Sequence, residues 1–179
     1  EFEGRVIARA DGSALYHLST AVDDMDDRIT HVLRGRDHLS NTELQQSIIR
    51  ALGGEPPVYV HAPLLTLPDG AKISKREGHQ TGGPDLTIAG LRAAGFPATA
   101  ILNALALSLA DFGVDEVMLT PHAIAERFDL ARLHSADSHY DADKLQWISG
   151  RHIREMSDRQ LSDALRERLT KELKLTAEQ

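Results

Sequence analysis

The segment from residue 28 to residue 65 constrains the fold more than any other part of the sequence. It begins with RITHVLRG (residues 28–35), whose side chains alternate in character with a period of two, typical of a buried β-strand that ends at Gly35. A helical pattern follows, and then VYVHAPLL (residues 58–65), whose β-branched and aromatic residues indicate a second strand. A strand, a helix and a strand in this order predict a βαβ unit, and therefore a parallel sheet with a right-handed crossover.

The helix between these strands is marked at both ends. Ser40 and Glu43 fit a capping box, in which each side chain bonds the backbone amide of the other residue. The Gly53-Gly54 pair is typical of a helix end. Between these signals the apolar residues recur one turn apart, at Leu44, Ile48 and Leu52. The segment from residue 15 to residue 22 is too short for its periodicity to distinguish a strand from the start of a helix.

From residue 84 onward the pattern is helical. Amphipathic or apolar helical segments are expected at residues 85–94, 96–113, 120–129, 141–157 and 157–173. Thr120 and Ser157 are expected as N-caps, and Pro121 stands at a first helical position. The sequence therefore predicts an α/β region followed by an all-α region, with domains at 1–80 and 81–179 and a Gly/Thr-rich boundary at 78–84.

Composition excludes several classes of function. A formal net charge of −7 excludes a broad basic coat, so any RNA contact needs a local patch. The absence of cysteine excludes disulfides and thiolate metal sites, and the nine histidines lack ligand spacing, so no metal site is predicted. No apolar run has the length of a membrane span and no signal peptide is recognisable, so we expect no membrane partner and a cytoplasmic location.

One short stretch concentrates positive charge. In KISKREG (residues 72–78), Lys72 and Lys75 flank Ser74, and Gly70 and Gly78 lie on either side. Mobile ammonium groups on a glycine-flanked loop suit a polyphosphate ligand. A solvated basic turn without specific function explains the same composition.

The order of several blocks favours the first explanation. They are YHLSTAVDD (16–24), ITHVLRGRDHLSNT (29–42), HAPLL (61–65), KISKREG (72–78), AAGFPATAILNALA (93–106) and FDLARL…YDADKLQWISGRHIR (128–154). In this order and spacing they resemble the second half of the catalytic domain of glutamyl-tRNA synthetases, a class I family, and the stem-contact helices that follow it. KISKR resembles the KMSKS loop of that family. The resemblance extends from about residue 5 to residue 156. It implies part of a Rossmann-like parallel sheet followed by a helical stem-contact bundle.

The resemblance also implies roles for individual residues. Lys75 would stabilise the triphosphate of ATP, with Mg²⁺ arriving on the nucleotide, and Lys72 and Ser74 would hold the loop closed. Arg34 would bind the carboxylate of the amino-acid substrate, since two N–H groups of a guanidinium form a fork that matches the two oxygens of a carboxylate. The remaining positions implied at the substrate are Tyr16, Thr20 and His38, and those implied at ATP are Leu64, Leu65 and Arg76.

Structural explanations stay open for some of these residues. Tyr16 and His17 could simply pack on a half-buried strand. Arg34 could pair with Asp37, or with the acidic cluster formed by Asp23, Asp24, Asp26 and Asp27.

Three features depart from the family pattern. These 179 residues contain no His-Ile-Gly-His-type motif, which in that family holds ATP on the side opposite the lysine loop, and no anticodon-binding domain is recognisable in them. Arg36 also stands where the family usually has an acidic residue.

We therefore expect either a piece of a glutamyl-tRNA synthetase, inactive alone, or a truncated homologue that binds tRNA or a partner. The complete enzyme would act on glutamate and tRNA. Half of a doubly wound sheet exposes an apolar edge, which predicts self-association or a second polypeptide.

Overall fold

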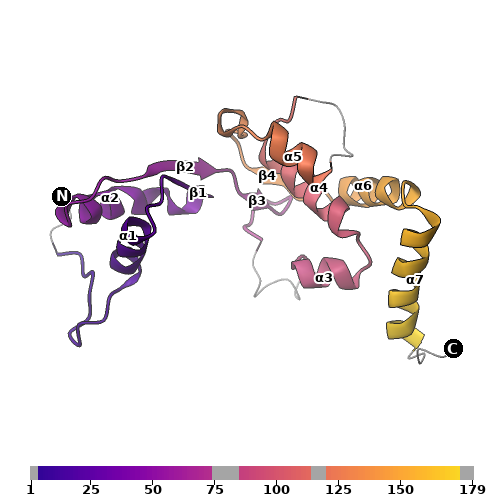
Figure 1. Ribbon diagram of the computed structural model, residues 1–179, viewed down its shortest axis with the longest axis horizontal. Coiled ribbons are helices and arrows are strands. Elements are labelled where there is room, and N and C mark those ends of the chain that lie inside the picture. Colours follow the sequence, from indigo (N-terminus) through magenta and orange to yellow (C-terminus); the bar gives the residue numbers. More distant parts are fainter. Residues whose placement is uncertain (1–3, 74–84, 114–119, 174–179) are drawn as a thin grey trace. The chain divides into compact units, whose positions relative to one another are not determined.

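The computed structural model describes residues 4–73, 85–113 and 120–173. The chain divides into two compact units, Glu1–Leu64 (unit 1) and Leu65–Gln179 (unit 2). Unit 1 is α/β and unit 2 is mostly helical, which confirms the predicted fold class (Figure 1). The expected boundary at residues 78–84 lies outside the described residues, so the domain limits stay a prediction.

Unit 1 contains the expected βαβ unit. Its elements are α1 (Tyr16–Asp26), β1 (His31–Gly35), the 3₁₀ helix η1 (Arg36–Asn41), α2 (Thr42–Ala51) and β2 (Val58–Ala62). Strands β1 and β2 pair in parallel, and the register places Arg34 opposite His61. Residues 16–22, whose conformation the periodicity left open, belong to helix α1.

The core of unit 1 lies between α1 and α2. Ala21 on α1 is fully buried, and its small side chain lets the two helices approach closely. From α2, Ile48 and Ile49 enter the same cluster, and Leu18 and Met25 of α1 pack around it. This core holds α2 in a fixed position behind the strand from which Arg34 projects.

The expected capping box at the start of α2 is wrong. Asn41 occupies the N-cap position with a helical backbone (φ −81°, ψ −19°) and makes no side-chain cap hydrogen bond. Ser40 lies inside η1, which runs directly into α2. An N-cap residue needs an extended backbone, and a helical turn in front of α2 removes that conformation.

Both predicted strands also differ from expectation. The first is shorter and less buried than expected, with Leu33 on β1 43% exposed. The second breaks after β2, and β3 (Leu65–Thr66) follows as a separate strand. Pro63 lies at the break, where the missing proline N–H cannot join a ladder.

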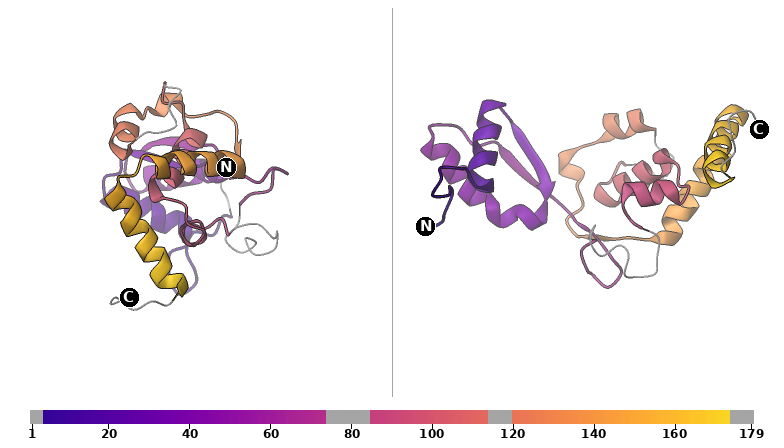
Figure 2. Two further views of the ribbon diagram at one scale, coloured as in Figure 1. Left: turned by 90° about the vertical axis from the view of Figure 1, so that its right-hand side faces the viewer. Right: turned by 90° about the horizontal axis from the view of Figure 1, so that it is seen from below.

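Unit 2 is built around helix α4. After β3, its elements are α3 (Ile88–Ala93), α4 (Ala98–Leu109), α5 (Pro121–Arg127), η2 (Leu130–Arg132), β4 (Ser138–His139), α6 (Ala142–Arg154) and α7 (Asp158–Leu173). Helix α4 packs against α6, and β3 pairs in parallel with β4. Figures 1 and 2 show α7 leaving the end of α6 at a steep angle.

The caps predicted at Thr120 and Ser157 are confirmed, whereas the segments expected from residues 85 and 96 begin as helices later, at Ile88 and Ala98. The Thr120 hydroxyl accepts a hydrogen bond from the Ala123 amide at 3.1 Å, and Pro121 begins α5. Ser157 and Gln160 form a reciprocal cap at the start of α7, because the Ser157 amide donates to Gln160 Oε1 at 2.9 Å and the Gln160 amide donates back to Ser157 Oγ at 3.3 Å. Among the described residues, no helix has the length and hydropathy needed to cross a membrane.

Candidate functional site

Arg34 lies near the carboxyl end of β1, where ligands bind in parallel sheets. Its guanidinium is held by neutral groups on two elements. Nη1 donates to Gln45 Oε1 at 2.6 Å and Nη2 donates to Thr42 Oγ1 at 2.8 Å, both from α2. Nε donates to His61 Nε2 on β2 at 3.5 Å. The ring of Tyr59 lies against the guanidinium, with 4.9 Å between Arg34 Cζ and the ring centroid.

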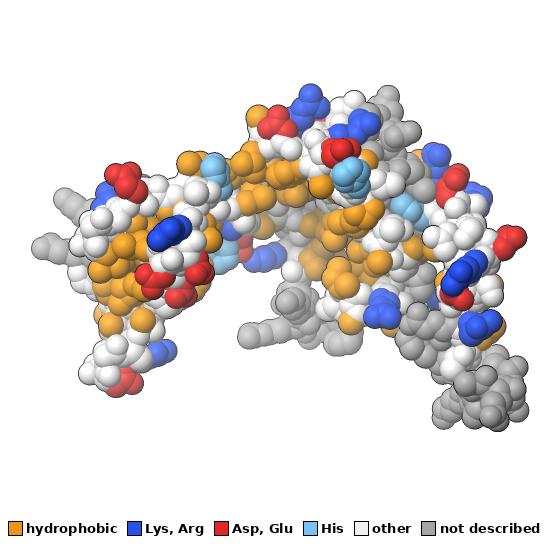
Figure 3. All heavy atoms as spheres, viewed as in Figure 1, with side chains coloured by type: hydrophobic (Ala, Val, Ile, Leu, Met, Phe, Trp, Pro, Cys, Tyr) orange, Lys and Arg blue, Asp and Glu red, His pale blue; other side chains and the backbone are white. Residues whose placement is uncertain are grey.

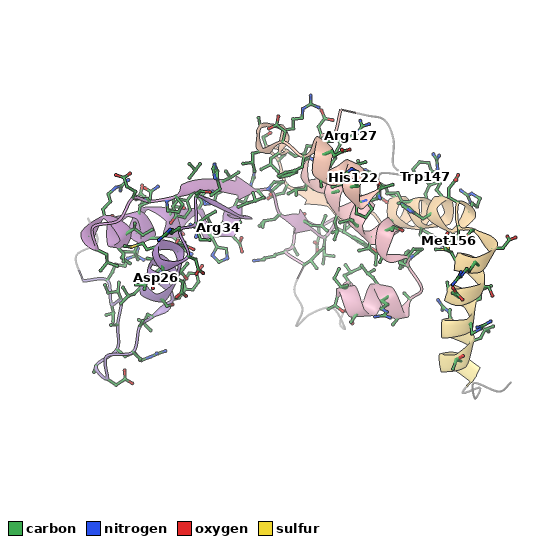
Figure 4. All side chains as sticks on the ribbon, viewed as in Figure 1. Asp26, Arg34, His122, Arg127, Trp147 and Met156 are labelled. Atoms are coloured by element: carbon green, nitrogen blue, oxygen red, sulfur yellow. The ribbon has the colours of Figure 1, made fainter. Side chains whose placement is uncertain are left out.

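We call these four residues, Gln45, Thr42, His61 and Tyr59, the Arg34 cradle. Its polar atoms are only partly satisfied, since Gln45 Nε2 and the Tyr59 hydroxyl are buried and lack a hydrogen-bond partner among the described residues. Buried polar groups without partners are rare away from functional sites. Figure 4 labels Arg34 on unit 1.

Space is tight at Gly35, the residue that ends the strand carrying Arg34. A Cβ atom there would lie 2.5 Å from Asp37 Oδ1 and 3.1 Å from Leu64 Cδ2. Any side chain at this position would displace the carboxylate or the leucine. The glycine in LRG thus lets Leu64, expected at ATP, pack close to the end of β1.

Tyr16 and His38 lie close to each other in the same unit. Their ring centroids are 6.3 Å apart, and Tyr16 makes an edge contact with His17 at 5.2 Å. His38 Nδ1 lies 3.1 Å from Asn41 Nδ2, and its Nε2 lies 3.8 Å from a carboxylate oxygen of Asp37. Tyr16 is 51% exposed, so it is not a packed core residue.

Helix α1 presents Thr20 and Asp24 one and two turns after Tyr16, which places all three on one helix face. Burial raises the pKa of Asp24, its neighbours Asp23 and Asp27 raise it further, and the charge of Arg34 opposes them. Asp24 is therefore a member of the acidic cluster that interacts electrostatically with Arg34. The cradle hydrogen bonds of Arg34 go to neutral groups. Burial also raises the pKa of Tyr59.

The lysine loop is described only where it begins. Lys72 is exposed and forms an isolated antiparallel bridge with Thr66 of β3. The turn before it closes through the Leu67 amide, which donates to the Ala71 carbonyl at 2.7 Å. Ser74, Lys75 and Arg76 lie outside the described residues. Leu65 begins β3 and belongs to unit 2.

Unit 2 contains a cavity of about 590 Å³ that the sequence did not reveal. Helices α3, α4 and α6 line it, mainly with leucine and isoleucine side chains. Two of its polar lining groups already have partners, because the Ser138 hydroxyl donates to the Ser108 carbonyl at 2.7 Å and His134 Nδ1 lies 3.2 Å from the same oxygen. The part of the chain that the structure describes holds no group of three or more His, Cys, Asp or Glu side chains suited to a metal ion.

The four residues of the Arg34 cradle were missed in the sequence. One signal for His61 was available, because pairing the predicted strands places it beside Arg34. A second was Gln45, a polar residue on the helix face that also carries Ile48 and Ile49, where full burial requires a partner.

Comparison with known proteins gives a consistent result. A family model described as "tRNA synthetases class I (E and Q), catalytic domain" matches residues 1–147. The glutamate–tRNA ligase of Paraburkholderia phytofirmans is 42% identical over 163 residues, which cover 91% of this chain and 33% of that protein. The enzyme of the same name from Burkholderia thailandensis is 41% identical over 162 residues, covering 90% of this chain and 33% of that protein.

Solved structures agree with the sequence match. The glutamate–tRNA synthetase of Elizabethkingia anophelis superposes with a TM-score of 0.82 at 26% identity, over 97% of this chain and 38% of that one. A glutamate–tRNA ligase from Elizabethkingia meningosepticum, in complex with its amino acid, gives a TM-score of 0.83 at 26% identity, over 97% of this chain and 37% of that one. The chain spans about a third of the length of these curated relatives. On the fold, the ordered motifs and the family match together, the chain belongs to the class I tRNA synthetases of the E and Q group, through their catalytic domain.

Proposed function

We propose that the chain is the second half of the catalytic domain of a glutamate–tRNA ligase, residues 1–80, followed by its stem-contact helices, residues 81–179. In the complete enzyme this part takes glutamate, ATP and tRNA as substrates and joins the amino acid to the tRNA. The observation that carries the proposal is the Arg34 cradle. It is built from neutral acceptors and an aromatic ring, so the positive charge of Arg34 remains available to an anion.

The geometry of Arg34 suits the carboxylate of an amino acid. A guanidinium has five N–H donors, and the cradle hydrogen bonds described above use one on each nitrogen. One donor is then left on each terminal nitrogen, and we propose that these two donors bind the two carboxylate oxygens. Tyr16, Thr20 and His38 border the same region and complete the proposed amino-acid site.

ATP is bound in this proposal by the lysine loop, with Lys75 at the triphosphate and Lys72 and Ser74 holding the loop. Leu64, Leu65 and Arg76 complete the nucleotide side, and Mg²⁺ enters as part of the substrate MgATP. Lys72 is exposed, which suits contact with a polyphosphate. Catalysis of this kind depends on positioning and charge stabilisation, and it requires the ATP-binding motif that these 179 residues lack. We therefore propose that the chain is inactive alone and acts in the cytoplasm as part of the larger enzyme.

A second candidate function is that of a binding module for tRNA, without catalysis. Trp147 on α6 is 50% exposed, and the guanidinium of Arg151 lies 5.4 Å from its ring centroid. Arg154 lies one turn further along the same helix. An exposed aromatic ring among basic side chains favours nucleic-acid binding without requiring an active site. Figure 4 labels Trp147 on α6.

A partner for the apolar surface belongs to either function. Figure 3 shows apolar side chains on the surface of both units. Leu33 and Val58, on the two strands of unit 1, are among the exposed apolar residues. We propose that a second polypeptide or a second copy of the chain covers this sheet. Strictly monomeric size-exclusion behaviour of a chain with an ordered sheet would contradict this part of the proposal.

Titration calorimetry with MgATP tests the catalytic proposal. We expect the chain to bind MgATP, and Lys75→Ala to weaken binding about 10- to 100-fold, because one charge-assisted contact contributes about 1.5–3 kcal/mol. Lys144→Ala, which removes an exposed lysine of α6, serves as the matched control and should leave the affinity unchanged.

Two results would count against a triphosphate site in this chain. Equal weakening in both variants would indicate non-specific attraction to positive charge. Absence of binding by the unmodified chain would favour the non-catalytic module, provided that tRNA binding is retained.

A further inference from the structure

His61 lies at the junction of two hydrogen bonds in the Arg34 cradle. Its Nε2 atom is 3.5 Å from Arg34 Nε and 3.1 Å from Thr42 Oγ1. Thr42 Oγ1 accepts a hydrogen bond from Arg34 Nη2, because a guanidinium can only donate. The hydroxyl hydrogen of Thr42 is then available to His61 Nε2. The Arg34 contact requires a bare Nε2 atom, with the imidazole proton on Nδ1, and the Thr42 hydroxyl can then donate to the same atom.

We infer that His61 is a positioning residue for Arg34: as a neutral imidazole it orients the guanidinium, and protonation of Nε2 releases that orientation. This inference rests on the proposed role of Arg34 at the substrate carboxylate. A proton on Nε2 would place an N–H donor against the N–H of Arg34 Nε. It would also add a second positive charge next to the guanidinium.

The surroundings of His61 favour the neutral form. Burial lowers the pKa of His61, and the electrostatic effects of Arg34 and His38 lower it further. On α2, Thr42 and Gln45 present uncharged groups to the cradle. On β2 and α1 the titratable groups beside the cradle are Tyr59, Tyr16 and Asp24.

The direction of the pH dependence follows from these charges. Because the pKa of His61 is lowered, the oriented state of Arg34 is present at neutral pH and is lost as the pH falls through that lowered pKa. Affinity for a carboxylate ligand should fall with it, because repulsion between the protonated ring and the guanidinium shifts the fork from the position in which it meets both oxygens at once.

NMR on the full chain tests the inference directly. We expect ¹⁵N shifts that identify the tautomer with Nδ1–H and bare Nε2, and an Arg34 Nε–H signal that shifts with the same midpoint as His61. In His61→Gln, which keeps an acceptor but does not titrate, the Arg34 signal should no longer follow pH. His31→Gln, which removes an exposed histidine of β1, should leave the titration as it is in the unmodified chain.

Several results would overturn the inference. One is an Nε2–H tautomer of His61. Another is an Arg34 signal that does not change as His61 titrates. A third is a pH response that persists in His61→Gln, since it would then originate from His38 or Asp24. The first two are read on the unmodified chain and do not depend on the folding of a variant.

Addition of L-glutamate separates this inference from the proposed function. We expect the dissociation constant to rise about tenfold when His61 is protonated, and to change less than about twofold over the same range in His61→Gln. If glutamate leaves the Arg34 signal unchanged at every pH, the proposed carboxylate site is wrong, while an Arg34 signal that follows His61 still supports the positioning role. If glutamate binds with the same affinity on both sides of the midpoint, the positioning role is wrong and the carboxylate site stands.

Discussion

Arg34→Lys is expected to lower the affinity of the chain for glutamate about 10- to 100-fold, because hydrogen bonds to a charged partner contribute about 1.5–3 kcal/mol. Lysine keeps the positive charge but has a single nitrogen at its tip. It cannot bond Gln45 and Thr42 of the cradle and also present a two-pronged fork to a carboxylate. Calorimetric or NMR titration with L-glutamate above the pKa of His61 measures the change.

Arg50→Lys is the matched control for this substitution, because Arg50 is exposed on α2 and lies outside the cradle. Its glutamate affinity should equal that of the unmodified chain. If Arg34→Lys also binds glutamate with unchanged affinity, charge alone is sufficient and the fork is not the recognition element.

Ile49→Ala is expected to lower the free energy of unfolding of unit 1 by about 2–5 kcal/mol, the usual cost of truncating a fully buried aliphatic side chain to alanine. Ile49 is 0% exposed and packs with Ala21, Leu44 and Ile48 between α1 and α2. A loss of this size is a large fraction of the stability of a small domain. Urea unfolding followed through backbone amide NMR signals reports on unit 1 and unit 2 separately.

Ile29→Ala makes the same chemical change at a position that is 39% exposed in the same unit. It should lower the stability by less than about 1 kcal/mol, because much of its side chain already contacts water. Equal losses in the two variants would show that the α1–α2 cluster does not hold unit 1 together.

Much of the fold was predictable from local sequence. The βαβ unit, the parallel pairing of its strands and the caps at Thr120 and Ser157 all follow from side chains within a few residues of each element. The capping box at Ser40 failed, although its residues match the pattern as well as those at Ser157. The difference is the 3₁₀ helix in front of α2, which the side chains of residues 40 to 43 do not indicate.

The candidate site was predictable only in part. The sequence, through its motifs, indicated Arg34, Tyr16 and His38, and the structure brings these three into unit 1 around the end of β1. The cradle adds a histidine, a threonine, a glutamine and a tyrosine to the contacts of Arg34, while Asp24 of the acidic cluster interacts with it electrostatically. Two of these partners, Gln45 and His61, lie 11 and 27 residues from Arg34 along the chain.

The sequence by itself determined the order of strands and helices, the membership of the synthetase family and the position of the arginine at a strand end. These properties depend on periodicity, turns and motifs, which neighbouring residues specify. The tertiary structure alone decided which groups hold the guanidinium, among them His61 on the neighbouring strand. That result needed the register of two strands and the packing of α2 on α1, because only these bring distant residues within hydrogen-bond distance.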